Sequence, residues 1–397
     1  MVSASATSAA ASPIRLGMVG GGQGAFIGAV HRMAARLDGH YMLVAGALSS
    51  DPERARASAA ELGLDPERSY GSFEEMAKEE AARADGIEAV SIVTPNHMHY
   101  PAAKAFLEAG INVICDKPLT SSLDDAKALV EAVKQSGKFF VLTHNYSGYP
   151  MIRQARQMVR DGALGDILLV QAEYPQDWLA EPIEETGQKQ ASWRTDPARS
   201  GTGGAIGDIG THAYQLVTFV TGLKAESVAA DLDSFGPGRR LDDNAHVLMR
   251  FAEGADGRRA KGVLWASQVA PGNENGLKLR VYGTKGGLEW VQADPNYLWY
   301  TPLGEPKRLI TRAGAGANEA AAVVTRIPSG HPEGYLEAFA TLYTEAAGAL
   351  RAIRDGGKLP QDLLLPTVED GLDGMRFIQG CVNSSRADAA WTRLGTL

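Results

Sequence analysis

The sequence predicts a two-domain α/β protein, in which a parallel sheet covered by helices precedes an α+β domain with an open, mainly antiparallel sheet. Its 397 residues exceed what one hydrophobic core usually serves. Short apolar runs alternate with helix-favouring stretches as far as Thr143, and longer strand-like segments dominate after it. We therefore expect a disordered, Ala/Ser-rich lead-in over residues 1–13, a first domain over 14–143 and a second domain over 144–397.

The first domain is expected to contain five parallel strands. These apolar and often β-branched runs are Ile14–Val19, Met42–Leu48, Ala89–Val93, Asn112–Cys115 and Phe139–Thr143. Three stretches between them are rich in the helix formers Ala, Glu, Lys and Leu, namely Ala55–Leu62, Tyr100–Ala109 and Leu123–Ser136. Strands that alternate with helices in this way form a parallel sheet with helical crossovers.

The second domain is expected to begin with one helix, Tyr149–Asp161, and to continue mainly in strands. The expected strands are Ile167–Tyr174, Ser227–Ser234, Asn244–Phe251, Arg259–Ala266 and Leu277–Tyr282. Glycine-containing turns join several of them, which favours antiparallel pairing. Two last helices, Gly334–Asp355 and Pro366–Ser384, are expected to pack back onto the body of the protein.

The charge balance argues against a nucleic-acid partner. Lys plus Arg number 39 and Asp plus Glu number 47, so the formal net charge is -8 and a polyanion would be repelled. The densest basic clusters, Arg239-Arg240 and Arg258-Arg259, are isolated pairs next to Gly and Asp, which is typical of solvated turns.

The sequence also indicates a cytoplasmic protein without a membrane partner. Residues 1–13 lack a basic segment followed by a Leu-rich one, and no apolar stretch reaches transmembrane length. The two cysteines, Cys115 and Cys381, lie far apart, which excludes a disulfide framework and favours buried, reduced thiols.

A glycine-rich turn follows the first strand. Gly20, Gly22 and Gly24, with Gln23 between them, would let the backbone approach a pyrophosphate at the next helix N-terminus, as in a Rossmann domain that binds NAD or NADP. The pattern departs from GxGxxG because the next suitable glycine, Gly28, comes late, so we expect an insertion over 23–27. An ordinary glycine-rich turn is the alternative.

Two further loops are expected at the cofactor. Thr94, Pro95 and Asn96 end a central strand, at the sheet edge where nucleotides bind, although a simple strand-ending turn would look the same. The second strand ends in Ser49 and Ser50, where NAD-specific domains carry an acid that binds the ribose 2′-hydroxyl.

Neutral residues at that strand end, with Arg54 nearby, predict that NADP is accepted. Asp51 and Glu53 would act against it if either reached the ribose. The alternative is that Asp51 caps the next helix and Pro52 occupies its first position.

The segment from Cys115 to Leu119 resembles the Glu-Lys-Pro motif of the Gfo/Idh/MocA oxidoreductase family, with Asp116 in place of the usual Glu. Thr94–His97, with His99 in the final place, is similar to the family's Thr-Pro-Asn-x-x-His segment. Trp193-Arg194 and the run Gly203–His212 resemble its substrate-domain motif. Where the family often has Arg after Asn145-Tyr146, this chain has Ser147, so any contact made by that Arg is in doubt.

The resemblance implies an open sheet that faces the nicotinamide and forms a homodimer or homotetramer interface, and a substrate that is a sugar, glycoside, inositol or related polyol. Gly330–Tyr335 resembles a segment of a polyol-specific subgroup. The residues expected to bind the cofactor are Gly20, Gly22, Gln23, Gly24, Ser49, Ser50, Arg54, Thr94, Pro95, Asn96, His99, Asp116, Lys117, Asn145, Trp193 and Arg194. Those expected to contact the substrate are Lys117, Tyr146, Trp178, Asp208, His212 and His331.

The chemistry requires a base for the hydroxyl proton, and His212 suits this role because the pKa of histidine is near neutral. Asp208, four residues earlier, would share a helix face with it and hold Lys117 or His212 in place. Lys117 follows a strand end, and its ammonium would polarise the reacting oxygen. Each residue has a structural alternative. His212 would be a histidine at a helix start that bonds to the backbone, Asp208 would be a helix N-cap, and Lys117 would be a surface lysine.

Two further predictions concern stacking on the substrate and metal binding. Trp178, Trp193 and Trp265 would stack on sugar rings, or lie in the core instead. No metal is expected, because His97 and His99 have no third ligand nearby.

Three functions fit these residues. The first is a dehydrogenase of a sugar, glycoside or inositol-type polyol. The second is an enzyme of the same scaffold that retains its cofactor and uses transient oxidation for glycoside cleavage or epimerisation. The third is a silent sugar or nucleotide sensor, against which the joint presence of Lys117, Asp208 and His212 argues.

Overall fold

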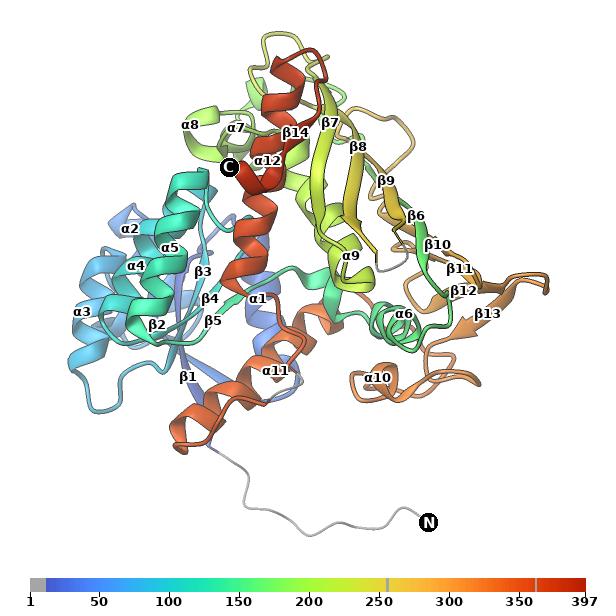
Figure 1. Ribbon diagram of the computed structural model, residues 1–397. Helices are drawn as coiled ribbons and strands as arrows, with labels where there is room; N and C mark the ends of the chain where they lie inside the picture. The colour runs from blue at the N-terminus through green and yellow to red at the C-terminus, as the bar shows by residue number, and fades with distance from the viewer. Residues whose placement is uncertain (1–11, 255–256, 361–362) are drawn as a thin grey trace, which may run out of the picture.

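A computed structural model describes residues 12–254, 257–360 and 363–397. All but two positions of the expected lead-in over 1–13 lie outside these residues. The described chain folds around two sheets, a five-stranded one in the first domain and a nine-stranded one in the second (Figure 1). Both cysteines are free and buried.

The first sheet is fully parallel, with strand order β2-β1-β3-β4-β5. Its strands are β1 (Ile14–Gly20), β2 (Tyr41–Ala47), β3 (Ala89–Val93), β4 (Asn112–Cys115) and β5 (Phe140–Leu142). Every residue of β3 is buried, as expected of a strand covered on both faces. The predicted parallel sheet is confirmed.

Helices cover both faces of this sheet (Figure 1). They are α1 (Phe26–Leu37), α2 (Pro52–Glu61), α3 (Phe73–Ala82), α4 (His99–Glu108) and α5 (Leu123–Ser136), with short 3-10 turns η1 (Pro66–Arg68) and η2 (Asn96–Met98). Helix α3 is not predicted from the sequence. Its many charged residues leave only a narrow apolar stripe, built around Met76 and Ala77.

Helix α11 (Tyr335–Arg354) comes from the C-terminal part of the chain and packs beside α1 on the first sheet (Figure 1). Phe339, Leu342 and Tyr343 share a buried cluster with Ile14 and Leu16 of β1. The first domain therefore completes its core with a helix that lies about 200 residues beyond its last strand, a distance that follows from the bounds of β5 and α11.

The second sheet has the order β13-β12-β11-β10-β6-β9-β8-β7-β14, and only β6 and β9 pair in parallel. Its strands are β6 (Ile167–Pro175), β7 (Ala225–Asp233), β8 (Asn244–Glu253), β9 (Arg259–Ser267), β10 (Lys278–Gly283), β11 (Gly286–Val291), β12 (Tyr297–Pro302), β13 (Arg308–Thr311) and β14 (Thr392–Arg393). The expected open, mainly antiparallel sheet is confirmed. Strands β11 to β14 are additional to the five that the sequence predicts. Strands β11 to β13 are short and follow one another closely, and β14 has only two residues.

One face of this sheet is covered and the other is open. The covering helices are α6 (Pro150–Arg160), α9 (Thr211–Thr221) and α12 (Val368–Arg386). The remaining short elements are η3 (Asn145–Gly148), η4 (Ile183–Thr186), α7 (Lys189–Arg194), α8 (Pro197–Ser200), the π-helical turn η5 (Ile206–Gly210), α10 (Glu319–Ala322) and η6 (Leu394–Thr396). On the open face large apolar side chains stay exposed, among them Leu169, Leu248, Val263 and Tyr282.

Neither a membrane-spanning helix nor a metal-binding cluster is found among the described residues. Within 12–254, 257–360 and 363–397, no helix is long and apolar enough to cross a membrane. The same residues contain no group of three or more His, Cys, Asp or Glu side chains arranged to hold a metal ion.

Candidate active site

In the glycine-rich turn after β1, backbone segments lie so close together that side chains at the glycine positions would clash with them. Gly20 and Gly21 have φ angles of +78° and +73°, which disfavour other residues. A Cβ on Gly22 would lie 2.7 Å from the carbonyl oxygen of Leu48, and one on Gly28 would lie 2.3 Å from the Cα of Gly21. Gly28 therefore provides the close packing of helix on strand, and the expected insertion forms the loop and the first turn of α1.

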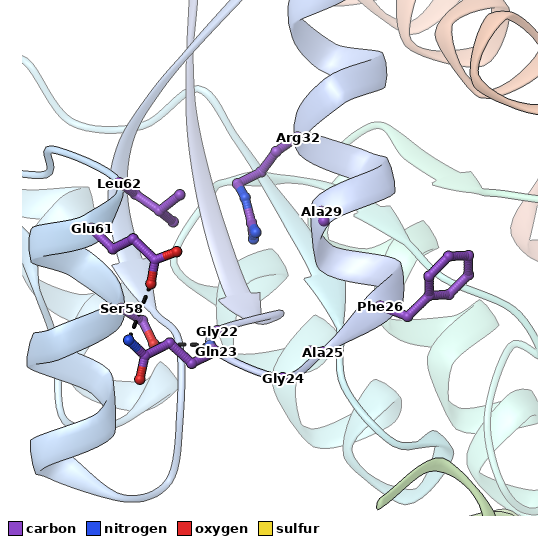
Figure 2. A pocket seen from close by; sticks show the side chains of 10 residues that line it. All are labelled: Gly22, Gln23, Gly24, Ala25, Phe26, Ala29, Arg32, Ser58, Glu61 and Leu62. Carbon is purple, nitrogen blue, oxygen red and sulfur yellow. Dashed lines mark hydrogen bonds between the residues drawn. The ribbon is translucent and has the colours of Figure 1, made fainter.

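Helix α2 holds the inserted loop from one side (Figure 2). The Gln23 amide N–H donates to Ser58 Oγ at 3.0 Å, and the Gln23 side chain donates to Glu61 Oε2 at 3.1 Å. Arg32 of α1 donates to the Gly21 carbonyl oxygen at 2.6 Å. Ala25, the N-cap of α1, offers no capping side chain, so the first amides of the helix are left for a ligand such as phosphate.

A cleft of about 540 Å³ opens at the carboxyl edge of the first sheet. Most residues predicted for the cofactor line it, namely Gly20, Gly22, Gln23, Ser49, Ser50, Arg54, Thr94, Pro95, Asn96, Asp116, Lys117, Trp193 and Arg194. Gly24 lines an adjoining hollow of about 420 Å³, which is the pocket in Figure 2. The cleft walls also include residues absent from the sequence prediction: Gly71, Ser72, Phe73, Glu74, Lys189, Gln190 and Arg199.

The end of β2 meets this cleft with neutral and basic groups. Ser49, Ser50 and Arg54 line it, whereas the Asp51 carboxylate accepts the Arg54 amide N–H at 2.8 Å and so caps α2. Pro52 is the first residue of that helix. The capping alternative from the sequence therefore describes Asp51 correctly.

Lys117 and Asp208 form an ion pair on the cleft wall. The Lys117 ammonium donates to Asp208 Oδ1 at 2.9 Å and to the Asp208 carbonyl oxygen at 2.7 Å, across 91 residues of chain. Arg194 Nε and Gln268 Nε2 donate to the other carboxylate oxygen at 3.2 and 2.9 Å. Burial would raise the pKa of Asp208, but the charges of Lys117 and Arg194 outweigh it and hold that pKa well below its usual range. The carboxylate is therefore ionised whenever this cluster is intact.

His212 lies near the start of α9, which continues from the π-helical turn that carries Asp208. Its ring is buried, with the ring centre of Tyr146 at 4.9 Å and that of His144 at 5.7 Å. Burial, helped by the charge of Lys117, lowers the pKa of His212 well below its usual value, so the imidazole is neutral at pH 7. Its Nδ1 is buried without a hydrogen-bond partner among the described residues.

Tyrosines surround His212 on the substrate-domain side. The hydroxyl groups of Tyr146 and Tyr174 lie 2.5 Å apart, and the ring of Tyr149 stacks on Tyr146 with centres 6.0 Å apart. Helix α11, which begins at Tyr335, packs against η3, the turn that carries Tyr146. Apart from Tyr146, these tyrosines are not predicted as site residues, because nothing in the neighbouring sequence distinguishes them from core residues.

Asp116 is held from behind by a buried chain of polar groups. Its Oδ1 accepts from the Lys117 amide at 2.9 Å and lies 3.9 Å from His31 Nε2. His31 Nδ1 and Ser91 Oγ each lie 2.8 Å from the Tyr343 hydroxyl. Burial would raise the pKa of Asp116, but the neighbouring His31 and the charge of Lys117 lower it to about 2.

Several predicted residues lie outside the walls of the cleft, and among them are three that were expected to contact the substrate, His212, Tyr146 and Trp178. His99 is fully buried, and its two ring nitrogens lie 2.8 and 3.0 Å from the carbonyl oxygens of Pro118 and Thr94, so it joins the two loops that border the cleft. Asn145 is buried too, with a side-chain nitrogen that has no partner among the described residues. His331 is exposed on a loop that Arg312 holds.

The three predicted tryptophans all belong to the second domain, and two of them lie near Arg194. Trp193 lies 4.2 Å from the Arg194 guanidinium, measured to the ring centre, and Trp178 lies 6.0 Å from it. Trp265 is on β9, where it donates to Asn244 at 3.0 Å and stacks on His246. Trp178 and Trp193 therefore flank the Asp208 cluster.

The residues present fit a bound dinucleotide. Around the cleft, the described polar atoms that are buried without partners include Thr94 Oγ1, His97 Nδ1 and Asn145 Nδ2. The glycine-rich turn after β1 lets the backbone come close to a ligand, and the first amides of α1 are free to donate. Together with these atoms, they supply donors and acceptors for phosphate, ribose and carboxamide groups.

Family models match both parts of the chain. The model described as an oxidoreductase family with an NAD-binding Rossmann fold matches residues 14–155. The model of the GFO/IDH/MocA C-terminal domain matches residues 152–289.

Solved structures and curated relatives agree with these matches. An oxidoreductase from Sinorhizobium meliloti is 63% identical, with a TM-score of 0.88, over 96% of this chain and 100% of that chain. An inositol dehydrogenase homolog from Azotobacter vinelandii, solved with NAD+, is 38% identical, with a TM-score of 0.91, over 96% and 98%. Levoglucosan dehydrogenase from Pseudarthrobacter phenanthrenivorans is 30% identical over 69% of this chain and 73% of its own length.

Proposed function

The chain belongs to the Gfo/Idh/MocA family of NAD-binding oxidoreductases, and from that premise we propose that its substrate is a sugar, glycoside or inositol-type polyol, oxidised at a secondary hydroxyl or reduced at the matching ketone. The observation that carries the proposal is the ion pair of Lys117 with Asp208 on the cleft wall, together with the neutral, buried His212, which follows Asp208 by four residues. The molecules bound in the structures of two relatives, myo-inositol and levoglucosan, belong to this chemical class.

Each residue of this group has a distinct task. Bound NAD supplies the acceptor for the hydride that leaves the carbinol carbon. His212, neutral at pH 7, accepts the proton of the substrate hydroxyl, which a protonated imidazole could not do. The Lys117 ammonium donates a hydrogen bond to the same oxygen and stabilises the developing alkoxide charge. Asp208 keeps that ammonium in position through two contacts.

The aromatic surroundings suit a ring-shaped polyol. Tyr146 and Tyr174 present ring surfaces and hydroxyl groups beside His212, and Trp178 and Trp193 flank Arg194 on the other side. Aromatic faces pack on the C–H surface of a sugar while the hydroxyl groups bond to its edges. His331 lies on the exposed loop, so we assign it no contact with the substrate.

A substrate panel tests the proposal. Purified protein is incubated with NAD or NADP and with a range of sugars, anhydrosugars and inositols, and the nicotinamide absorbance is followed. Net reduction with at least one polyol is expected, and none across the panel contradicts the proposal. Protein that is purified with stoichiometric dinucleotide and shows no net reduction supports the retained-cofactor alternative instead.

We also propose that the open face of the second sheet joins copies of the chain into a homodimer or homotetramer. Leu169, Leu248 and Val263 are each about half exposed on neighbouring strands β6, β8 and β9. Large apolar side chains exposed on adjoining strands favour contact with a second copy of the chain.

A further inference from the structure

A separate cavity lies at the β14 edge of the second sheet. Its volume is about 850 Å³, and its residues are distinct from those of the active-site cleft. Strands β7, β8 and β9, helix α12 and the C-terminal turn η6 all contribute to its walls, and Figure 1 shows β14 and the end of α12 beside β7. Five cationic side chains line it: Lys224, Arg250, Arg259, Arg376 and Arg393.

Two of these cations are neutralised by carboxylates. Arg259 lies 2.8 Å from Glu226, and Lys224 lies 4.0 Å from Asp370. Asp373, the other acid of the cavity wall, accepts a hydrogen bond from the Tyr214 hydroxyl at 3.1 Å.

The other three cations form no ion pair within the part of the chain that the structure describes. The Arg250 guanidinium lies over the ring of Trp391, 3.7 Å from its centre, and has no carboxylate within 4.0 Å. Arg376 and Arg393 have none either, and Arg376 Nε is buried without a hydrogen-bond partner among the described residues. A buried donor without a partner costs free energy unless a ligand or water satisfies it.

The sheet register places two of these cations on one face of the sheet. Arg393 of β14 pairs with Ser227 of β7, which pairs with Arg250 of β8, so Ser227 lies between the two arginines. Arg250 pairs directly with Lys261 of β9, and like charges in that arrangement repel. In a chain of net charge -8, this local excess of positive charge calls for a counter-charge.

We propose that this cavity binds a small organic anion that carries phosphate or carboxylate groups. Guanidinium groups bind both through paired N–H donors, and Arg250, Arg376 and Arg393 are free to supply them. The volume lies within the usual range for small-molecule sites and exceeds what a bare inorganic ion fills. The exposed part of Trp391 offers an apolar surface for the organic portion.

Isothermal titration of the whole protein tests the site, with inorganic phosphate and citrate as probes at an ionic strength kept constant with KCl. Saturable binding of at least one probe is expected, and the two arms separate phosphate from carboxylate recognition. Arg376→Gln and Arg393→Gln should each weaken that binding about tenfold, because each removes a charge-assisted contact. Arg308→Gln is the matched control, since Arg308 is an exposed arginine on the edge strand β13, at the opposite end of the sheet from β14.

Three outcomes overturn the proposal. These are the absence of saturable binding for both probes, a response that KCl alone reproduces, and equal binding by wild type and both arginine variants. Circular dichroism verifies that the variants are folded, and Arg393 is exposed enough for its replacement to leave the core intact. If the variants instead change the oligomer mass without altering probe binding, the cations pair with a second copy and the anion site does not exist.

Discussion

At the scale of single residues, the active site depends on charges whose state is set by burial and neighbours together. Asp208 stays ionised although it is buried, because Lys117 and Arg194 supply two positive charges. His212 stays neutral because it is buried beside the positive charge of Lys117. One buried ion pair therefore keeps both its own carboxylate and the neighbouring imidazole in the protonation states that the proposed proton abstraction requires.

Replacement of His212 by Ala should lower turnover by roughly a hundredfold or more, since a positioned general base is lost. Binding of NAD, measured by fluorescence titration, should change little. In the wild type, oxidation should fall only when the pH drops well below the usual pKa of histidine, because the pKa of His212 is lowered. Near wild-type turnover in the variant would refute the assignment.

Lys117→Ala should reduce turnover to a similar extent, and Lys117→Arg should not restore it. A planar guanidinium cannot replace a compact ammonium that contacts Asp208 Oδ1 and one substrate oxygen at once. Steady-state kinetics of both variants provide the measurement. Full rescue by Arg would mean that only a positive charge is needed there.

Ser49→Asp should shift cofactor preference toward NAD by about tenfold, since a new carboxylate at the end of β2 repels the 2′-phosphate of NADP. The wild type should accept NADP, because Ser49, Ser50 and Arg54 face the cleft while Asp51 caps α2. Comparison of kcat/KM with the two cofactors checks both statements. Complete failure of NADP with the wild type would show that Asp51 or Glu53 approaches the ribose after all.

At the scale of elements, α11 links the C-terminal part of the chain to the loop that carries Lys117. The hydroxyl of its Tyr343 contacts His31 of α1, and His31 faces Asp116, the residue before Lys117. A helix that the sequence places after the second sheet thus supports the active-site loop of the first domain.

Tyr343→Phe should therefore lower the free energy of unfolding by about 1–3 kcal/mol, because His31 Nδ1 and Ser91 Oγ lose a buried partner. It should also lower kcat more than it raises KM, since Asp116 loses the support of a fixed His31. Thermal unfolding and steady-state kinetics give the two readouts. Tyr282→Phe, at an exposed position of β10, is the control, and equal behaviour of both variants would contradict the link.

At the scale of the whole molecule, the open face of the second sheet is the proposed interface between copies of the chain. Val263→Arg, in the middle of that face, should reduce the oligomer mass measured by light scattering, because a charge would be buried against apolar side chains. Lys307→Gln, at the sheet's far end, should leave the mass unchanged. A wild type that is monomeric at all concentrations would contradict the interface.

The sequence by itself determined the features that follow from local pattern. The parallel strands from Ile14 to Leu142, the antiparallel character of the second sheet and the family motifs around Lys117 and His212 are all properties of contiguous residues. Apolar periodicity and glycine spacing record how each segment meets its immediate surroundings, so they can be interpreted before the fold is known.

Only the tertiary structure decided which distant residues meet. The contact of Tyr343 with His31, the tyrosines around His212, the burial of His99 and the exposure of His331 each depend on how elements far apart in the chain pack. The cations at the β14 edge come together in the same way, through strand pairing and the return of the C-terminus. Such long-range contacts leave no pattern among neighbouring residues of the sequence, because they contribute to the free energy only when the chain has folded.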